Sequence, residues 1–92
     1  MCTINLKDIM SNQSLPDAGS KLLDIMMAKL NAGENIILDL GGIPSLPSIF
    51  LNTSIGKFIE ENGVELLKQK VSFAQITKGQ AERLQEYIRK FE

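Results

Sequence analysis

The segment from residue 36 to residue 50 constrains the fold more than any other part of the chain. A run of apolar residues, Ile36 to Leu38, stops at Asp39, and a loop containing glycine and proline leads into an amphipathic segment that begins near Ser48. This pattern predicts a buried β-strand, a loop and a helix start. In open α/β proteins, sites usually lie at this carboxyl edge of the sheet. We therefore expect an α/β fold with its site in or beside this loop.

The composition is that of one ordinary globular domain. The chain has 92 residues, of which 43% are hydrophobic and 23% are charged, and we expect a single domain over residues 1–92 with one modest core. Ten basic and eleven acidic residues leave a net charge of −1, which is a poor basis for binding nucleic acid. No apolar run approaches the roughly 20 residues that span a bilayer, so we expect no membrane segment.

Several residue types that catalysis and metal binding use are missing from the sequence. There is no histidine and the only cysteine is Cys2, so imidazole chemistry, a thiolate zinc site and an internal disulfide are excluded. Gly41-Gly42 is a glycine pair and not a phosphate-binding loop. The N-terminal residues do not resemble a signal peptide. We therefore expect a cytoplasmic protein without cofactor, metal or intrinsic enzymatic turnover.

Strand-like and helix-like segments alternate along the chain. The periodicity predicts strands over 3–10, 35–40 and 70–76 and helices over 15–30, 48–62 and 77–91. Residues 64–67 could extend the second helix or begin an extended segment. Strands joined through helices imply a mainly parallel βαβαβα sheet with right-handed crossovers. We expect a small three-layer domain with strand order 2-1-3, whose free sheet edge could also pair with a second copy.

The same loop resembles the signature of the STAS family, the sulphate-transporter and anti-sigma-factor-antagonist domains. The similarity is strongest to short, stand-alone STAS-like members of largely unassigned function. In these, a strand ending in an acidic residue runs through a small or serine-rich stretch into phenylalanine. The residues that hold those places here are Asp39-Leu40, Ile43, Ser45, Ser48 and Phe50.

The resemblance implies a regulatory domain that docks on a protein partner, such as a kinase-like ATPase or an anti-sigma-type protein. The expected partner surface is the loop and the second helix, comprising Ser45, Pro47, Ser48, Ile49, Asn52, Thr53 and Lys57. In phosphorylatable family members the loop reads Asp-Ser-Ser, and the second serine is the usual acceptor. The alignment places Ile49 at that position, which leaves Ser48 as the candidate for phosphorylation.

Other interpretations of these residues stay open. Ser48 is also a favoured helix cap whatever the function. Asp39 could accept a phosphoryl group in a receiver-like domain, although the end of the first strand supplies no second acid. It is more simply explained as a strand-end residue that binds amides of the Gly41-Gly42 turn. A self-associating structural domain is the third alternative.

Overall fold

Three parallel strands form the sheet: β1 (Cys2–Asn5), β2 (Ile36–Asp39) and β3 (Val71–Ala74). The computed structural model describes residues 2–11 and 13–92. The predicted parallel α/β architecture is confirmed, but the predicted strand order 2-1-3 is wrong, because the order is β1-β2-β3. The middle position suits β2, which is apolar on both sides. The alternating polar residues of β1 suit an edge.

Helices fill the connections between the strands and follow the last one. They are α1 (Leu6–Met10), α2 (Leu15–Asn31), α3 (Ser48–Thr53), α4 (Ile55–Asn62), α5 (Val64–Lys70) and α6 (Lys78–Arg89). The segment 64–67, which the sequence left undecided, is therefore helical. It belongs to α5. Gly63, which precedes this helix, has a positive φ of 89°.

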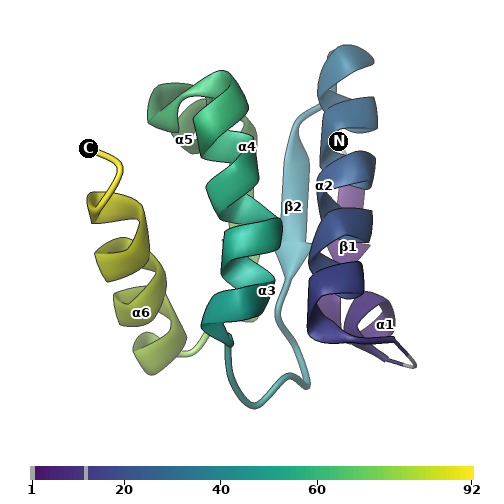
Figure 1. Cartoon of the computed structure of the whole chain (residues 1–92), viewed down its shortest axis with the longest axis vertical. Helices are drawn as coiled ribbons and strands as arrows, with labels where there is room; N and C mark the ends of the chain where they lie inside the picture. The colour runs from purple at the N-terminus through teal and green to yellow at the C-terminus, as the bar shows by residue number, and fades with distance from the viewer. Residues whose placement is uncertain (1, 12) are drawn as a thin grey trace.

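The helices lie on one side of the sheet, so the arrangement has two layers and not the predicted three (Figure 1). Right-handed crossovers that always advance in one direction place their helices on the same face. Accordingly, α2 packs against both α3 and α4. On the opposite face of the sheet, Thr3 and Ser72 are exposed and Ile37 between them is half-buried.

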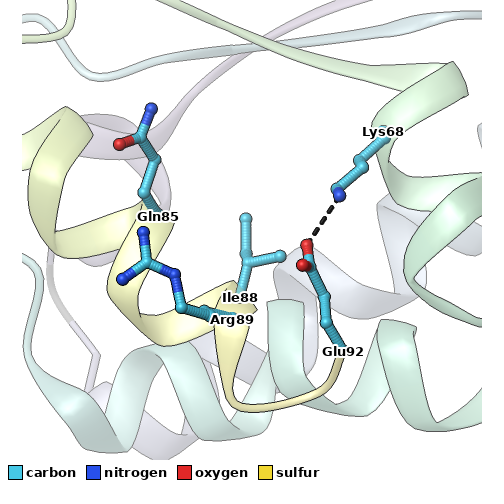
Figure 2. A pocket seen from close by; sticks show the side chains of 5 residues that line it. All are labelled: Lys68, Gln85, Ile88, Arg89 and Glu92. Atoms are coloured by element: carbon cyan, nitrogen blue, oxygen red, sulfur yellow. Dashed lines mark ion pairs between the residues drawn. The ribbon is translucent and has the colours of Figure 1, made fainter.

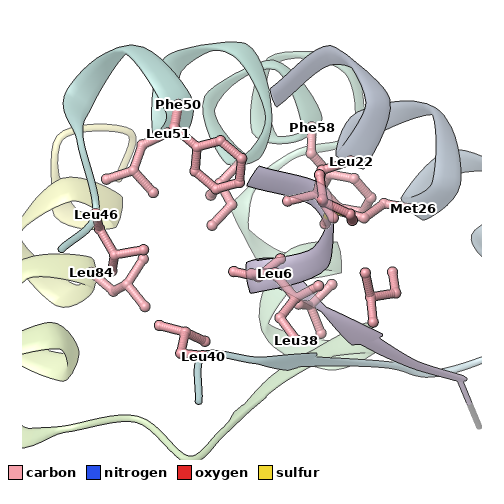
Figure 3. Close-up of a cluster of buried hydrophobic side chains, with 14 of the residues drawn as sticks. Leu6, Leu22, Met26, Leu38, Leu40, Leu46, Phe50, Leu51, Phe58 and Leu84 are labelled. Carbon is pink, nitrogen blue, oxygen red and sulfur yellow. The ribbon is translucent and has the colours of Figure 1, made fainter. Parts of the chain in front are cut away.

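The core fills the space between this helical layer and the inner face of the sheet (Figure 3). Leu22 and Met26 of α2, Phe50 of α3 and Phe58 of α4 meet Leu38 of β2, and all five are fully buried. Leu84 brings α6 into the same core from beyond β3. Among the described residues, no helix is long and apolar enough to cross a membrane.

The first predicted strand, over residues 3–10, is half strand and half helix. β1 ends at Asn5, whose Oδ1 accepts a hydrogen bond from the Asp8 backbone N–H at 3.2 Å and so caps α1. Asparagine competes for backbone groups in this way and favours helix starts over strand interiors. Leu6 and Ile9, one helical turn apart, are both buried.

The second predicted helix, over 48–62, is divided at Ser54 into α3 and α4. The buried Ser54 hydroxyl donates to the Phe50 carbonyl at 2.7 Å, and Thr53 Oγ1 donates to the Ile49 carbonyl at 2.9 Å. Hydroxyls that bond back to carbonyls four residues earlier compete with the helical ladder and bend helices. The backbone of Ser54 is not helical (φ −118°, ψ −84°).

Candidate functional site

The loop that leaves β2 begins with a turn organised by Asp39. Its Oδ1 accepts a hydrogen bond from the Gly41 backbone N–H at 2.8 Å, and its Oδ2 accepts one from Gln75 Nε2 at 3.3 Å. Both carboxylate oxygens thus have partners within the fold. The residues beside it in the sheet are Asn5 and Ala74, neither of which is acidic. The prediction that Asp39 binds the glycine turn is confirmed.

Side chains from α6 hold the remainder of this loop. Gln80 Nε2 donates to the Ile43 carbonyl at 3.0 Å, and Arg83 Nε donates to the Leu46 carbonyl at 2.6 Å. Gln80 is itself fixed, because its Oε1 accepts from the Thr77 N–H at 3.1 Å in the capping box that starts α6. A loop with two prolines is therefore tied at two carbonyls to a helix that lies far along the sequence.

Ser48 is not the cap of α3, contrary to one of its two predicted roles. Pro47 occupies the N-cap position and makes no side-chain cap bond, so Ser48 is the first helical residue. The Ser48 Oγ instead accepts a hydrogen bond from Arg83 Nη2 at 3.0 Å. Its exposed hydroxyl therefore lies beside a guanidinium group at the surface.

The predicted site residues divide into a group at the surface and a group engaged within the fold. Ser45, Ser48, Ile49, Asn52 and Lys57 are exposed. Ile49 is the strongest indication of a binding surface. Of its surface, 47% is exposed, and it is the large hydrophobic residue that the described part of the chain leaves in solvent.

Thr53 and Pro47 are half-buried. The Thr53 hydroxyl bonds within α3, and its side chain packs where α3 meets Gly19 of α2. Thr53 therefore lies at the contact between α2 and α3, beneath the exposed residues of α3. The exposed site residues of α3 and its preceding loop form a patch, called here the loop–α3 surface: Ser45, Ser48, Ile49 and Asn52.

Tyr87 of α6 completes the support of this surface. Its hydroxyl donates to Asn52 Oδ1 at 2.7 Å. Burial, and to a lesser extent the nearby negative charge of Glu60, raises the pKa of the Tyr87 phenol above its ordinary value of 10.0. The neutral phenol is thus the form that the fold favours.

Sequence reasoning missed the three residues of α6 that organise the site. Gln80, Arg83 and Tyr87 recur at intervals of three and four, so they share one helical face with the buried Leu84. The sequence signal that could have indicated their role is that these polar residues lie on the same helical face as a core leucine. Their partners lie 35 to 37 positions earlier, a separation at which no local pattern operates.

The family comparison matches residues 18–81 to the model described as "STAS-like domain of unknown function (DUF4325)". The chain belongs to this family. No curated protein and no solved structure matches the chain. The matched segment of this STAS-like domain includes β2, the loop and α3, but it ends before Arg83 and Tyr87.

In the described part of this STAS-like domain, acidic residues and the cysteine do not gather into a metal-binding group. Within residues 2–11 and 13–92, no cluster of three or more such side chains could hold an ion. The chemistry of the loop–α3 surface is that of hydroxyls, an amide and one exposed apolar side chain. Such a surface can form hydrogen bonds and bury apolar area against another molecule.

Proposed function

We propose that this STAS-like domain is a non-catalytic regulatory module that docks on a protein partner through the loop–α3 surface and the neighbouring Lys57 of α4. The exposed Ile49 carries this proposal. An apolar side chain surrounded by polar groups is the usual composition of an interface centre and its rim. A kinase-like ATPase is the first partner to test, because the resemblance of the loop to anti-sigma-factor antagonists implies a partner of that kind.

The rigidity of the surface supports the proposal. Arg83 and Gln80 hold the loop at two carbonyls, and Tyr87 holds Asn52. A surface that is ordered before binding loses less conformational entropy when it meets a partner.

The test is a titration of the purified domain with a kinase-like ATPase encoded beside it, followed by calorimetry. Ile49→Asp and Lys57→Glu should each weaken association, the first by about tenfold or more because it places a charge in a desolvated contact. Both residues are exposed, so the variants should remain folded.

Matched controls lie on α2. Ala28→Asp and Lys21→Glu make the same kinds of change at exposed positions of that helix and should leave the affinity unchanged. If the α2 variants weaken binding and the site variants do not, the docking surface is elsewhere.

A phosphoserine switch at Ser48 is a second candidate function for the same surface. The observation that favours it is the 3.0 Å contact between Arg83 Nη2 and Ser48 Oγ. A phosphate on this exposed hydroxyl would gain a charge-assisted bond from the guanidinium. It would also compete for Arg83 with the Leu46 carbonyl.

Incubation with the same kinase-like protein and ATP, followed by mass spectrometry, tests this second function. Modification should map to Ser48. An Arg83→Gln variant should still be modified, but its phosphorylated form should lose the added thermal stability that the arginine contact supplies. Modification confined to Ser14 or Ser72 would contradict the idea.

A further inference from the structure

A groove runs between β3 and α6, away from the loop–α3 surface. One cavity of about 330 Å³ is lined by Ser72 and Phe73 of β3, by Ile76, and by Ala81, Leu84 and Ile88 of α6, among others. A second cavity, of about 410 Å³, is lined by Lys68, Arg89 and Glu92 and shares Gln85 and Ile88 with the first. The two cavities therefore lie next to each other along α6, and together they make up the groove.

The groove reaches over the free edge of β3. Ser72 and Phe73 point to opposite faces of the sheet, so a cavity that touches both must include the edge between them. The Ala74 carbonyl faces β2, because it accepts from the Leu40 N–H at 3.0 Å. By alternation the backbone N–H and C=O of Phe73 face outward. β3 is the last strand of the sheet, and such an edge can pair with another strand.

The two ends of the groove differ in chemistry. One end is apolar, and its residues each leave part of their surface in contact with solvent: Phe73, Ile76, Ala81 and Ile88. The far end holds two cationic groups. Figure 2 shows Lys68 facing the Glu92 carboxylate, which it contacts at 2.6 Å, while Arg89 lies on the same side of α6 as Gln85. A carboxylate thus already occupies the cationic end.

We propose that this groove binds an extended peptide segment of another protein, which adds to β3 as a fourth strand. Its backbone pairs with the outward groups of Phe73, and alternate apolar side chains cover the α6 side of the groove. An acidic residue of the peptide takes the place of Glu92 beside Lys68 and Arg89. Main-chain pairing supplies affinity and the flanking side chains supply selectivity, as in other cases of strand addition.

To test this proposal, peptides are selected from a random dodecapeptide display library on the immobilised domain, and the enriched peptides are synthesised. Binding is measured by fluorescence anisotropy. Hydrogen exchange of the Phe73 amide is followed by NMR with and without peptide. We expect enriched peptides to alternate apolar and polar residues, to carry an acid near one end, and to slow exchange at Phe73.

Two variants and two peptide analogues make the test specific. Ala81→Glu should weaken binding by about tenfold, because a charge enters the apolar part of the groove. Lys68→Glu should weaken it by about threefold, as expected for an exposed charge pair. Ala28→Glu and Lys21→Glu on α2 are the matched controls and should have no effect. Of two peptides N-methylated at alternate residues, only the one that blocks pairing with β3 should lose affinity.

Any of the following results with peptides would overturn the proposal. They are a selection that enriches no peptide, peptides that bind without slowing exchange at Phe73, equal binding by both methylated analogues, and equal binding by the Ala81→Glu variant. Slowed exchange at Phe73 that depends on protein concentration without peptide would assign the edge to a second copy of the chain and would also contradict it. The Ile49 and Lys57 variants should bind the peptides normally, so this groove and the loop–α3 surface fail or succeed separately.

Discussion

At the scale of single residues, the site depends on contacts that α6 makes with distant backbone and side-chain groups. Tyr87 donates to Asn52, and Arg83 donates to both Leu46 and Ser48. Tyr87 is also the only tyrosine of a chain without tryptophan. Its ionisation can therefore be observed without interference.

Stability should fall at alkaline pH as Tyr87 ionises. Burial raises its pKa in the folded state, so the stabilisation is present below the ordinary value of 10.0 and is lost as pH rises through the raised value. Phenolate absorbance should titrate at higher pH in the folded than in the denatured protein. Tyr87→Phe should flatten the alkaline loss of unfolding free energy, and it should cost about 1 kcal/mol at neutral pH through the lost bond to Asn52. Identical titration of the folded and denatured protein would contradict this.

Arg83→Ala should lower the free energy of unfolding by about 1–2 kcal/mol, because a charged donor to the Leu46 carbonyl and to Ser48 is removed. Urea denaturation measures the change. Arg89→Ala is the matched control on the exposed side of the same helix and should stay within about 0.5 kcal/mol of the parent. Equal losses in the two variants would mean that the loop does not depend on Arg83.

At the scale of helices, α2 and α3 pack tightly against each other at Gly19. Gly19 of α2 lies against α3 so closely that an added Cβ would overlap Thr53 Oγ1 and come within 2.9 Å of the Phe50 carbonyl oxygen. The absence of a side chain at Gly19 thus sets the distance between the helix that covers β1 and β2 and the helix that carries Ile49.

Gly19→Ala should therefore destabilise the fold by about 1–3 kcal/mol, as overpacking does, although alanine is the better helix former by about 1 kcal/mol. A Thr53→Ala background should recover part of the loss and not all, since the Phe50 carbonyl remains. Gly79→Ala in the first turn of α6 meets nothing within 4 Å and should not destabilise. Thermal and urea unfolding are compared for the parent, Gly19→Ala, Thr53→Ala, the double variant and Gly79→Ala.

At the scale of the whole molecule, the strand order decides which surfaces meet water. With the order β1-β2-β3, the crossovers leave one face of the sheet uncovered, and Thr3 is exposed there while its neighbour Ile4 is buried. With β1 in the middle and helices on both faces, Thr3 would have been covered.

Thr3→Lys should accordingly change the free energy of unfolding by no more than about 0.5 kcal/mol. Ile4→Ala should cost about 2–5 kcal/mol, because it leaves a cavity in the core. The two are measured together by urea denaturation. A loss in Thr3→Lys that matches the loss in Ile4→Ala would show that the outer face is covered after all.

The sequence by itself determined the alternation of strands and helices, the parallel sheet, the loop after Asp39 and the family. These follow from patterns that are local, such as the apolar run ending at Asp39 and the capping box at Thr77 and Gln80. The helix start at Ser48 was also correct, because periodicity within a few residues is enough to place it.

Only the tertiary structure decided the strand order, the division at Ser54 and the role of α6. The order depends on which strand takes the middle position of the sheet, and that is a property of the assembled layers. The division at Ser54 depends on the burial of its hydroxyl, which then donates to the Phe50 carbonyl and not to water. No local pattern marks Arg83, because its partners Leu46 and Ser48 come beside it only when α6 folds back along the loop. Contacts between residues so distant in sequence leave no periodic trace, since they are chosen by the packing of whole elements.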